Sequence, residues 1–152
     1  MSQESPVSLV ELSFFAHATE DQSKVMRAAQ KLIPKTCLDN VSFRRDNLRG
    51  HYGNQIIRFS SRVHDKETAK LIVEKIASEL RSKDKEYLLS QIANHTDDKG
   101  NLYLRLDKQS AYLGEIKVGC SDPIRVRIKL RLSPKSLNNM VRVCRSLDLI
   151  PS

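Results

Sequence analysis

The stretch Ile124-Arg125-Val126-Arg127-Ile128-Lys129-Leu130-Arg131-Leu132 alternates strictly between apolar and basic residues. A period of two is typical of a β-strand, whose successive side chains point to opposite faces of the sheet. The stretch therefore predicts a strand with one apolar face and one cationic face. We call the cations Arg125, Arg127, Lys129 and Arg131 the basic ladder. They are expected roughly 6.5 Å apart, a spacing similar to that of successive phosphates on a nucleic acid.

Three interpretations of the basic ladder are open. Like charges repel one another, and no acid interrupts the row, which favours a surface that binds a polyanion. The ladder could instead mark an edge strand that is protected from aggregation by its charge, or a surface that meets an acidic protein. Three of the four cations are Arg, whose planar fork matches phosphate, and this favours the first interpretation.

The composition limits the function classes. With 152 residues and 39% hydrophobic content, residues 1–152 are expected to form a single domain with a hydrophobic core. The net charge of +8 suggests an acidic partner, and the absence of Trp argues against base stacking as the main source of affinity. No segment resembles a signal peptide or a membrane span, so we expect a cytoplasmic protein with no membrane contact. The three Cys lack metal-ligand spacing and are expected to be buried free thiols.

The remaining periodicities predict an α+β fold. Strands are expected at 9–17, 41–49 and 55–63, and a hairpin at 102–118. Helices are expected at 20–33, beginning with a capping box at Thr19–Gln22, at 65–80, and at 85–94. Ser133-Pro134 is expected to begin a last helix that ends near Leu147. Short connections between strands imply a mostly antiparallel sheet with the helices on one face, a two-layer sandwich whose other face is open.

A second basic pair accompanies the ladder. Arg58 and Arg62 lie on the face of strand 55–63 that is opposite its apolar residues. They can extend the basic surface sideways, or they can belong to an ordinary solvated face. Lys108, at the expected hairpin tip, is a further candidate for contacts to a nucleic-acid backbone.

Two motifs carry a resemblance to a known family. The segments Arg49-Gly50-His51-Tyr52-Gly53-Asn54-Gln55-Ile56 and Tyr103-Leu104-Arg105-Leu106-Asp107-Lys108-Gln109-Ser110-Ala111-Tyr112-Leu113-Gly114, with the basic strand after Asp122, resemble the archaeal RNA-binding protein family described as predicted exosome subunits. The match covers most of the chain in the same order, although Gln55 stands where Pro is expected. The resemblance implies a fold similar to that of a 5S-rRNA-binding ribosomal protein, RNA as the ligand, and a link to RNA processing or degradation.

The glycine turn in the first motif has two possible roles. Its backbone amides can cradle a phosphate, which makes the neighbouring Arg49 and His51 candidate RNA contacts. It can also be a structural turn over which Tyr52 packs. Similarly, Asp107 in the second motif can serve simply to hold Arg105 or Lys108 in place.

The sequence offers little for catalysis. The four His are scattered, and no phosphate-binding loop or nucleophile motif occurs. Asp97, Asp98 and Asp107 could assemble a divalent-metal site, but Asp-Asp-Lys-Gly in a loop is usually just a turn. We therefore expect a non-enzymatic RNA-binding protein without cofactor or metal. The alternatives are a module that docks on an exosome or ribosome assembly and a metal-dependent ribonuclease. The sequence also leaves a homo-oligomer open.

Overall fold

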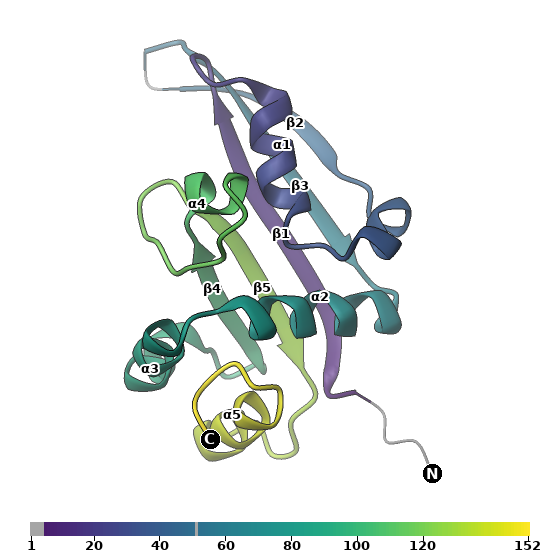
Figure 1. The fold of residues 1–152 in the computed structure, drawn as a ribbon, viewed down its shortest axis with the longest axis vertical. Helices are drawn as coiled ribbons and strands as arrows, with labels where there is room; N and C mark the ends of the chain where they lie inside the picture. Colours follow the sequence, from purple (N-terminus) through teal and green to yellow (C-terminus); the bar gives the residue numbers. More distant parts are fainter. Residues whose placement is uncertain (1–4, 51) are drawn as a thin grey trace.

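The computed structural model describes residues 5–50 and 52–152, which form a five-stranded antiparallel sheet with helices packed on one face (Figure 1). The strand order is β2-β3-β1-β5-β4. The strands are β1 (Val7–His17), β2 (Arg44–Arg49), β3 (Gln55–Val63), β4 (Asn101–Leu106) and β5 (Ile124–Leu130). This confirms the predicted α+β class and antiparallel sheet.

The helices leave most of the second face of the sheet open. Helices α1 (Gln22–Gln30), α2 (Lys66–Glu79) and α4 (Lys108–Tyr112) lie over one face in Figure 1. Helices α3 (Ser82–Ser90) and α5 (Leu137–Ser146) lie near one end of β4. Two 3-10 helices, η1 (Lys35–Asn40) and η2 (Ile92–His95), complete the fold. None of the described helices is long and apolar enough to span a bilayer.

Alternating burial along the two central strands places the core. Leu12 and Phe14 of β1 and Val126 of β5 are almost fully buried under α2, which contributes Ile72 and Ile76 to the same cluster. Their neighbours in sequence face the opposite side of the sheet. The apolar residues that alternate with the basic ladder on β5 supply the core, so the ladder itself lies on the open face.

The predicted hairpin at 102–118 is wrong. After β4 the chain forms the short helix α4, and only one isolated bridge, between Leu106 and Val118, remains of the expected pairing. The Asp107 carboxylate accepts a hydrogen bond from the Ser110 amide, a side-chain cap that begins the helix. Consequently β4 pairs with β5, directly beside the basic ladder.

Two predicted helix starts are displaced. Helix α1 is capped by Asp21 rather than by Thr19, so the predicted capping box is wrong. Helix α5 is capped by Ser136, after the Ser133-Pro134 pair that was expected to begin it. The thiols also differ in part from expectation, since Cys37 and Cys144 are buried and Cys120 is exposed. Burial raises the pKa of Cys144 to about 12.

Candidate nucleic-acid interface

The open face of the sheet gathers basic side chains from four strands. Residues directly opposite each other in neighbouring strands share a face, so the observed register assigns each side chain to one side. Two acidic side chains, Glu11 and Asp46, lie on this face. The basic side chains on it are Arg44, Arg58, Arg62, Arg105, Arg125, Arg127 and Lys129.

The ladder strand β5 is internal, with β1 on one side and β4 on the other. An internal strand has no unpaired backbone edge to protect. The interpretation of the ladder as a charged edge strand is therefore wrong. The edge at β4 is covered instead by η2 and the following residues, through a bridge between Thr96 and Leu102 and a hydrogen bond from His95 Nδ1 to the Tyr103 carbonyl (2.9 Å).

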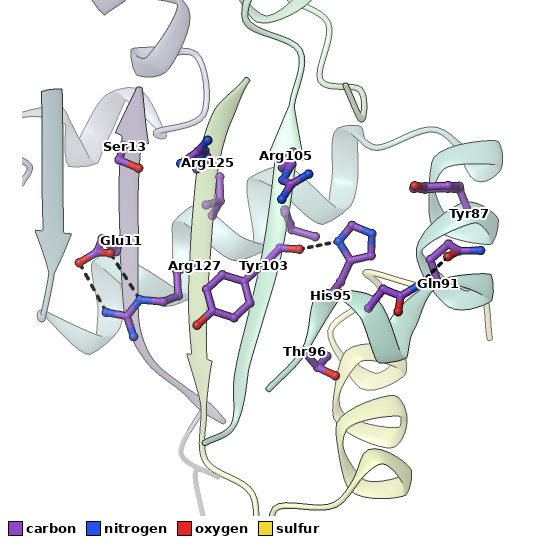
Figure 2. Close-up of a pocket in the computed structure, with 13 residues that line it drawn as sticks. Glu11, Ser13, Tyr87, Gln91, His95, Thr96, Tyr103, Arg105, Arg125 and Arg127 are labelled. Carbon is purple, nitrogen blue, oxygen red and sulfur yellow. Dashed lines mark hydrogen bonds and ion pairs between the residues drawn. The ribbon is translucent and has the colours of Figure 1, made fainter. Parts of the chain in front are cut away.

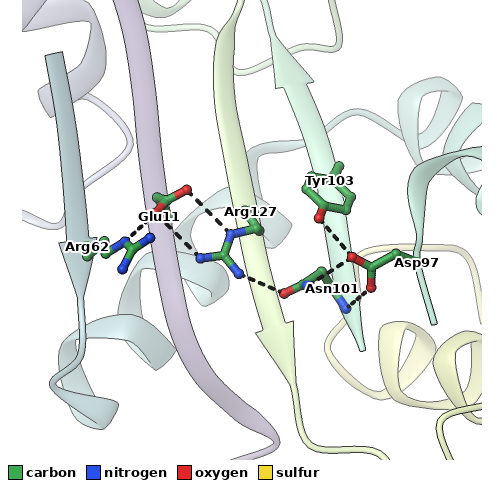
Figure 3. A network of polar contacts seen from close by, with 6 residues as sticks. All are labelled: Glu11, Arg62, Asp97, Asn101, Tyr103 and Arg127. Atoms are coloured by element: carbon green, nitrogen blue, oxygen red, sulfur yellow. Dashed lines mark hydrogen bonds and ion pairs between the residues drawn. The ribbon is translucent and has the colours of Figure 1, made fainter. Parts of the chain in front are cut away.

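Arg127, at the centre of the ladder, is neutralised by a carboxylate (Figure 3). Glu11 lies opposite Arg127 on β1. Its carboxylate accepts hydrogen bonds from Arg127 Nε (3.4 Å) and from Arg62 Nε (2.7 Å). On its other side, Arg127 Nη1 donates to Asn101 Oδ1 (3.0 Å). Both guanidinium groups are thus ion-paired with Glu11 in the free protein, and the contact of Arg127 and Arg62 with RNA stays a prediction.

The polar network continues to the β4 edge. Asp97 accepts hydrogen bonds from the side chain of Asn101 (2.9 Å) and from the Tyr103 hydroxyl (2.8 Å). Burial alone would raise the pKa of both acids, but the donors outweigh it. Hydrogen bonds from Arg62 and Arg127 lower the pKa of Glu11, and those from Asn101 and Tyr103 hold the pKa of Asp97 well below its usual range. The hydrogen bond that the Tyr103 hydroxyl donates to Asp97 raises the pKa of Tyr103.

Other cations on the face have no such partner. Arg125 lies directly opposite Arg105 on β4, and no described carboxylate forms an ion pair with either. Lys129 and Arg58 also lack a side-chain partner within residues 5–50 and 52–152. Like charges placed directly opposite destabilise a sheet. An anion bound between Arg105 and Arg125 would offset this repulsion.

The open face is hollowed on both sides of Glu11. One groove, of about 690 Å³, extends from Ser13 and Arg125 across Arg105 to Tyr87 of α3 and His95 of η2 (Figure 2). A second groove, of about 710 Å³, lies over β2 and β3 and is lined by basic residues that include Arg58 and Arg62. Glu11 lines both. The surface thus has two grooves that contain basic side chains, the second also lined by Asp46, with the ion-paired Arg62–Glu11–Arg127 group between them.

The remaining predicted contacts are less central. Arg131 follows the end of β5, and its guanidinium donates to the Ser5 carbonyl. Arg49 pairs with Gln55 at the tip of the β2–β3 hairpin, on the helix side of the sheet, so it does not share a face with Arg58. His51 lies outside the described residues.

Lys108 has a structural position rather than an exposed one. Its ammonium group donates to the Phe15 carbonyl (2.9 Å), to Glu20 (3.0 Å) and to Asp122 (2.6 Å), and the residue is only 9% exposed. These contacts join the end of β1 to the loop before β5. Lys108 is therefore a nearly buried residue of α4 that bridges two carboxylates, not a residue at a hairpin tip, and its contact with an RNA backbone stays a prediction.

Within the described residues, this cluster contains one group of side chains with the spacing of metal ligands. It consists of His17, Glu20 and Asp122. Burial raises the pKa of Asp122, but hydrogen bonds from Lys108 and His17 outweigh it and lower that pKa. The Lys108 ammonium already occupies the position of a cation between the carboxylates. A metal would have to displace it, so the residues fit a metal poorly.

Sequence reasoning missed the side chains that complete the first groove, namely Arg105, Tyr87 and His95. Tyr103 and Arg105 alternate with buried leucines on β4, a signal that their face is polar. This polar face of β4 lies beside the basic ladder because β4 pairs with β5. The predicted hairpin instead paired β4 with the segment that ends at residue 118. Tyr87 and His95 carry no local signal of their own.

Comparison with known proteins places the chain in a family. A family model described as RNA binding matches residues 9–130, most of the chain, from the third residue of β1 to the end of β5. The chain belongs to this RNA-binding family. The RNA-binding protein PAB1135 of Pyrococcus abyssi is 33% identical over 138 residues, covering 90% of each chain. The uncharacterized protein MJ0213 of Methanocaldococcus jannaschii is 36% identical over 121 residues, covering 76% of this chain and 78% of that one.

Solved structures share the fold of this family member. Protein AF2318 of Archaeoglobus fulgidus superposes with a TM-score of 0.79 at 27% identity, covering 93% of this chain and 99% of that chain. Mth689 of Methanothermobacter thermautotrophicus gives a TM-score of 0.74 at 26% identity, with 93% and 97% covered. Both are described as DUF54 proteins. The archaeal homologues bear out the expected family at the level of RNA binding.

Proposed function

We propose that this protein binds the sugar-phosphate backbone of RNA on the open face of its sheet, without enzymatic chemistry. One observation carries the proposal: on the internal strand β5, Arg125 lies opposite Arg105 with no described carboxylate beside either. A pair that destabilises the free protein is expected where a polyanion compensates for it. Arg forks match phosphate oxygens bidentately, which supports phosphate as the anion.

The affinity is assigned mainly to four cations of the open face that have no side-chain partner among the described residues, Arg58, Arg105, Arg125 and Lys129. Each phosphate contact contributes about −0.7 to the log-log salt slope on a single strand, so about four contacts predict a slope near −3. A slope shallower than about −2 would count against the proposal. Because phosphate contacts carry no sequence information, RNAs of different sequence should bind with similar affinity.

A matched pair of variants tests the location. Arg125→Gln removes a cation from the open face, whereas Arg27→Gln removes one from the exposed surface of α1, in the helical layer. In filter binding to protein-free RNA, Arg125→Gln should flatten the salt slope by about 0.7 and Arg27→Gln should leave it unchanged. Equal effects of the two variants would contradict the assignment to the sheet.

Three finer expectations stay predictions. They are a link to RNA processing or degradation, the similarity to a 5S-rRNA-binding ribosomal protein, and the alternative in which the chain is a module that docks on an exosome or ribosome assembly. The absence of nuclease activity is proposed because Lys108 already lies between the carboxylates that approach His17. Incubation of labelled RNA with the purified protein and Mg²⁺ or Mn²⁺ tests it, and cleavage lost on replacing Asp122 would refute it.

A further inference from the structure

The groove beside α3 combines a cationic floor with aromatic walls. Arg105 and Arg125 project side by side from β4 and β5, while Tyr87 and His95 approach from α3 and η2 (Figure 2). Its volume of about 690 Å³ lies within the range of small-molecule sites, roughly 300 to 1,000 Å³. The groove is therefore large enough for one nucleotide, and its lining is more varied than phosphate binding requires.

Tyr103 presents a ring that is held in place but uncovered. Its hydroxyl donates to Asp97 (2.8 Å), and Asp97 is fixed in turn by Asn101. The ring is seen face-on in Figure 2, flat against the open side of the sheet, and the residue is 41% exposed. A fixed aromatic face that points to solvent is what a base needs for stacking.

A second aromatic pair forms the opposite wall. Tyr87 is 47% exposed, and its ring meets His95 edge-to-face with centroids 6.0 Å apart. His95 is itself oriented by its bond to the Tyr103 carbonyl, which can only accept, so Nδ1 carries the proton. Its Nε2 has no partner in the described part of the chain and is left to accept from, or when protonated donate to, a ligand.

We infer that this groove is a subsite for one unpaired nucleotide of single-stranded RNA, with the phosphate on Arg105 and Arg125 and the base stacked on Tyr103 beside Tyr87. The inference rests on the proposed backbone binding and deepens it. Bases inside a duplex are stacked on one another and cannot reach a side-chain ring, whereas unpaired bases can. Stacking tolerates all four bases, because each has a π-face, so this subsite adds affinity for single strands without strong sequence preference.

The composition of the chain allows a direct spectroscopic test. It has four Tyr and no Trp, so its intrinsic emission comes from tyrosine, and two of the four line this groove. Titration with a short single-stranded oligonucleotide should quench this emission. A duplex of the same length should bind at least about tenfold more weakly and quench little, since stacking contributes about that factor per base.

Variants of Tyr103 and Tyr87 distinguish the contribution of the aromatic rings to RNA affinity from that of the basic side chains. Tyr103→Leu and Tyr87→Leu should each lower single-strand affinity by about tenfold, while the affinity ratio of single strand to duplex falls toward one. Tyr103→Phe, which keeps the ring and loses only the bond to Asp97, should restore the affinity lost in Tyr103→Leu. Circular dichroism confirms folding. Tyr87→Leu remains informative if Tyr103→Leu unfolds, because the Tyr87 side chain makes no hydrogen bond to the described part of the chain.

The outcomes distinguish this inference from the proposed function. Equal binding of single strand and duplex, with full affinity retained in both leucine variants, would overturn the nucleotide subsite. The backbone proposal would survive that result if Arg125→Gln still flattened the salt slope. Absence of binding to any RNA would overturn both.

Discussion

Glu11→Gln should increase RNA affinity although it removes native contacts. Glu11 shares its single negative charge between two guanidinium groups at the centre of the open face, through contacts of 2.7 Å to Arg62 and 3.4 Å to Arg127. Glutamine keeps the shape of the side chain and removes its charge. Both arginines, previously engaged, then become available to phosphate.

The magnitude follows from counterion release. One additional phosphate contact steepens the log-log salt slope by about 0.7 and raises affinity about fivefold at 0.1 M salt; two contacts give about 1.4 and 25-fold. The cost in stability is small, because Arg62 is two-thirds exposed and its pair is well screened. We expect a loss of about 1 kcal/mol in the free energy of unfolding, mostly from Arg127.

Fluorescence anisotropy of a labelled single-stranded RNA between about 50 and 200 mM salt measures the RNA affinity and its salt slope. Glu74→Gln is the matched control, since Glu74 contacts Lys70 on α2, in the helical layer. An affinity and slope that are unchanged or reduced in folded Glu11→Gln would refute the reasoning that RNA meets this face. So would an equal gain in the control variant.

Three further predictions concern stability. Lys108→Met leaves two carboxylates close together without their cation and should lower the free energy of unfolding by about 3 kcal/mol, measured by thermal melting; a melting temperature within about 2 °C of the native one would contradict this. In the folded protein the pKa of Asp97 lies below its ordinary value of 3.8. The Asp97 carboxylate therefore contributes fully to the free energy of unfolding above pH 3.8, and this contribution is lost as the pH falls through the folded pKa. Urea unfolding across pH should therefore find that Asp97→Asn loses less stability in acid than the native protein does, and equal losses would show that the carboxylate does not matter. Arg105→Gln relieves the repulsion with Arg125 and should raise stability by about 0.5 kcal/mol at low salt, less at high salt, while lowering RNA affinity; a loss of stability would show that the pair is not repulsive.

Local periodicity in the sequence predicted the elements that bear most of the site. The alternation of residues 124–132 identified both the buried and the basic face of β5, and the helix expected at 65–80 is found at Lys66–Glu79. Such patterns are visible because each depends on residues within a few positions of one another. The same information separated Arg58 and Arg62 from the apolar residues of β3.

Contacts between distant residues were not predictable in this way. Glu11 and Arg127 are 116 positions apart, and only the β1–β5 register brings them together. The uninterrupted row of cations therefore looked more available than it is. Lys108 was misplaced for a related reason, because the helix capped by Asp107 turns it toward Glu20 and Asp122 instead of a hairpin tip.

Ultraviolet crosslinking of a bound single-stranded RNA, with the joined residues identified by mass spectrometry, tests the central claim most directly. The account predicts crosslinks on the open face and its groove, above all at Tyr103 and Tyr87, and their loss at high salt. Crosslinks concentrated on the exposed surfaces of α1 and α2 would place the RNA on the helical layer and contradict the account.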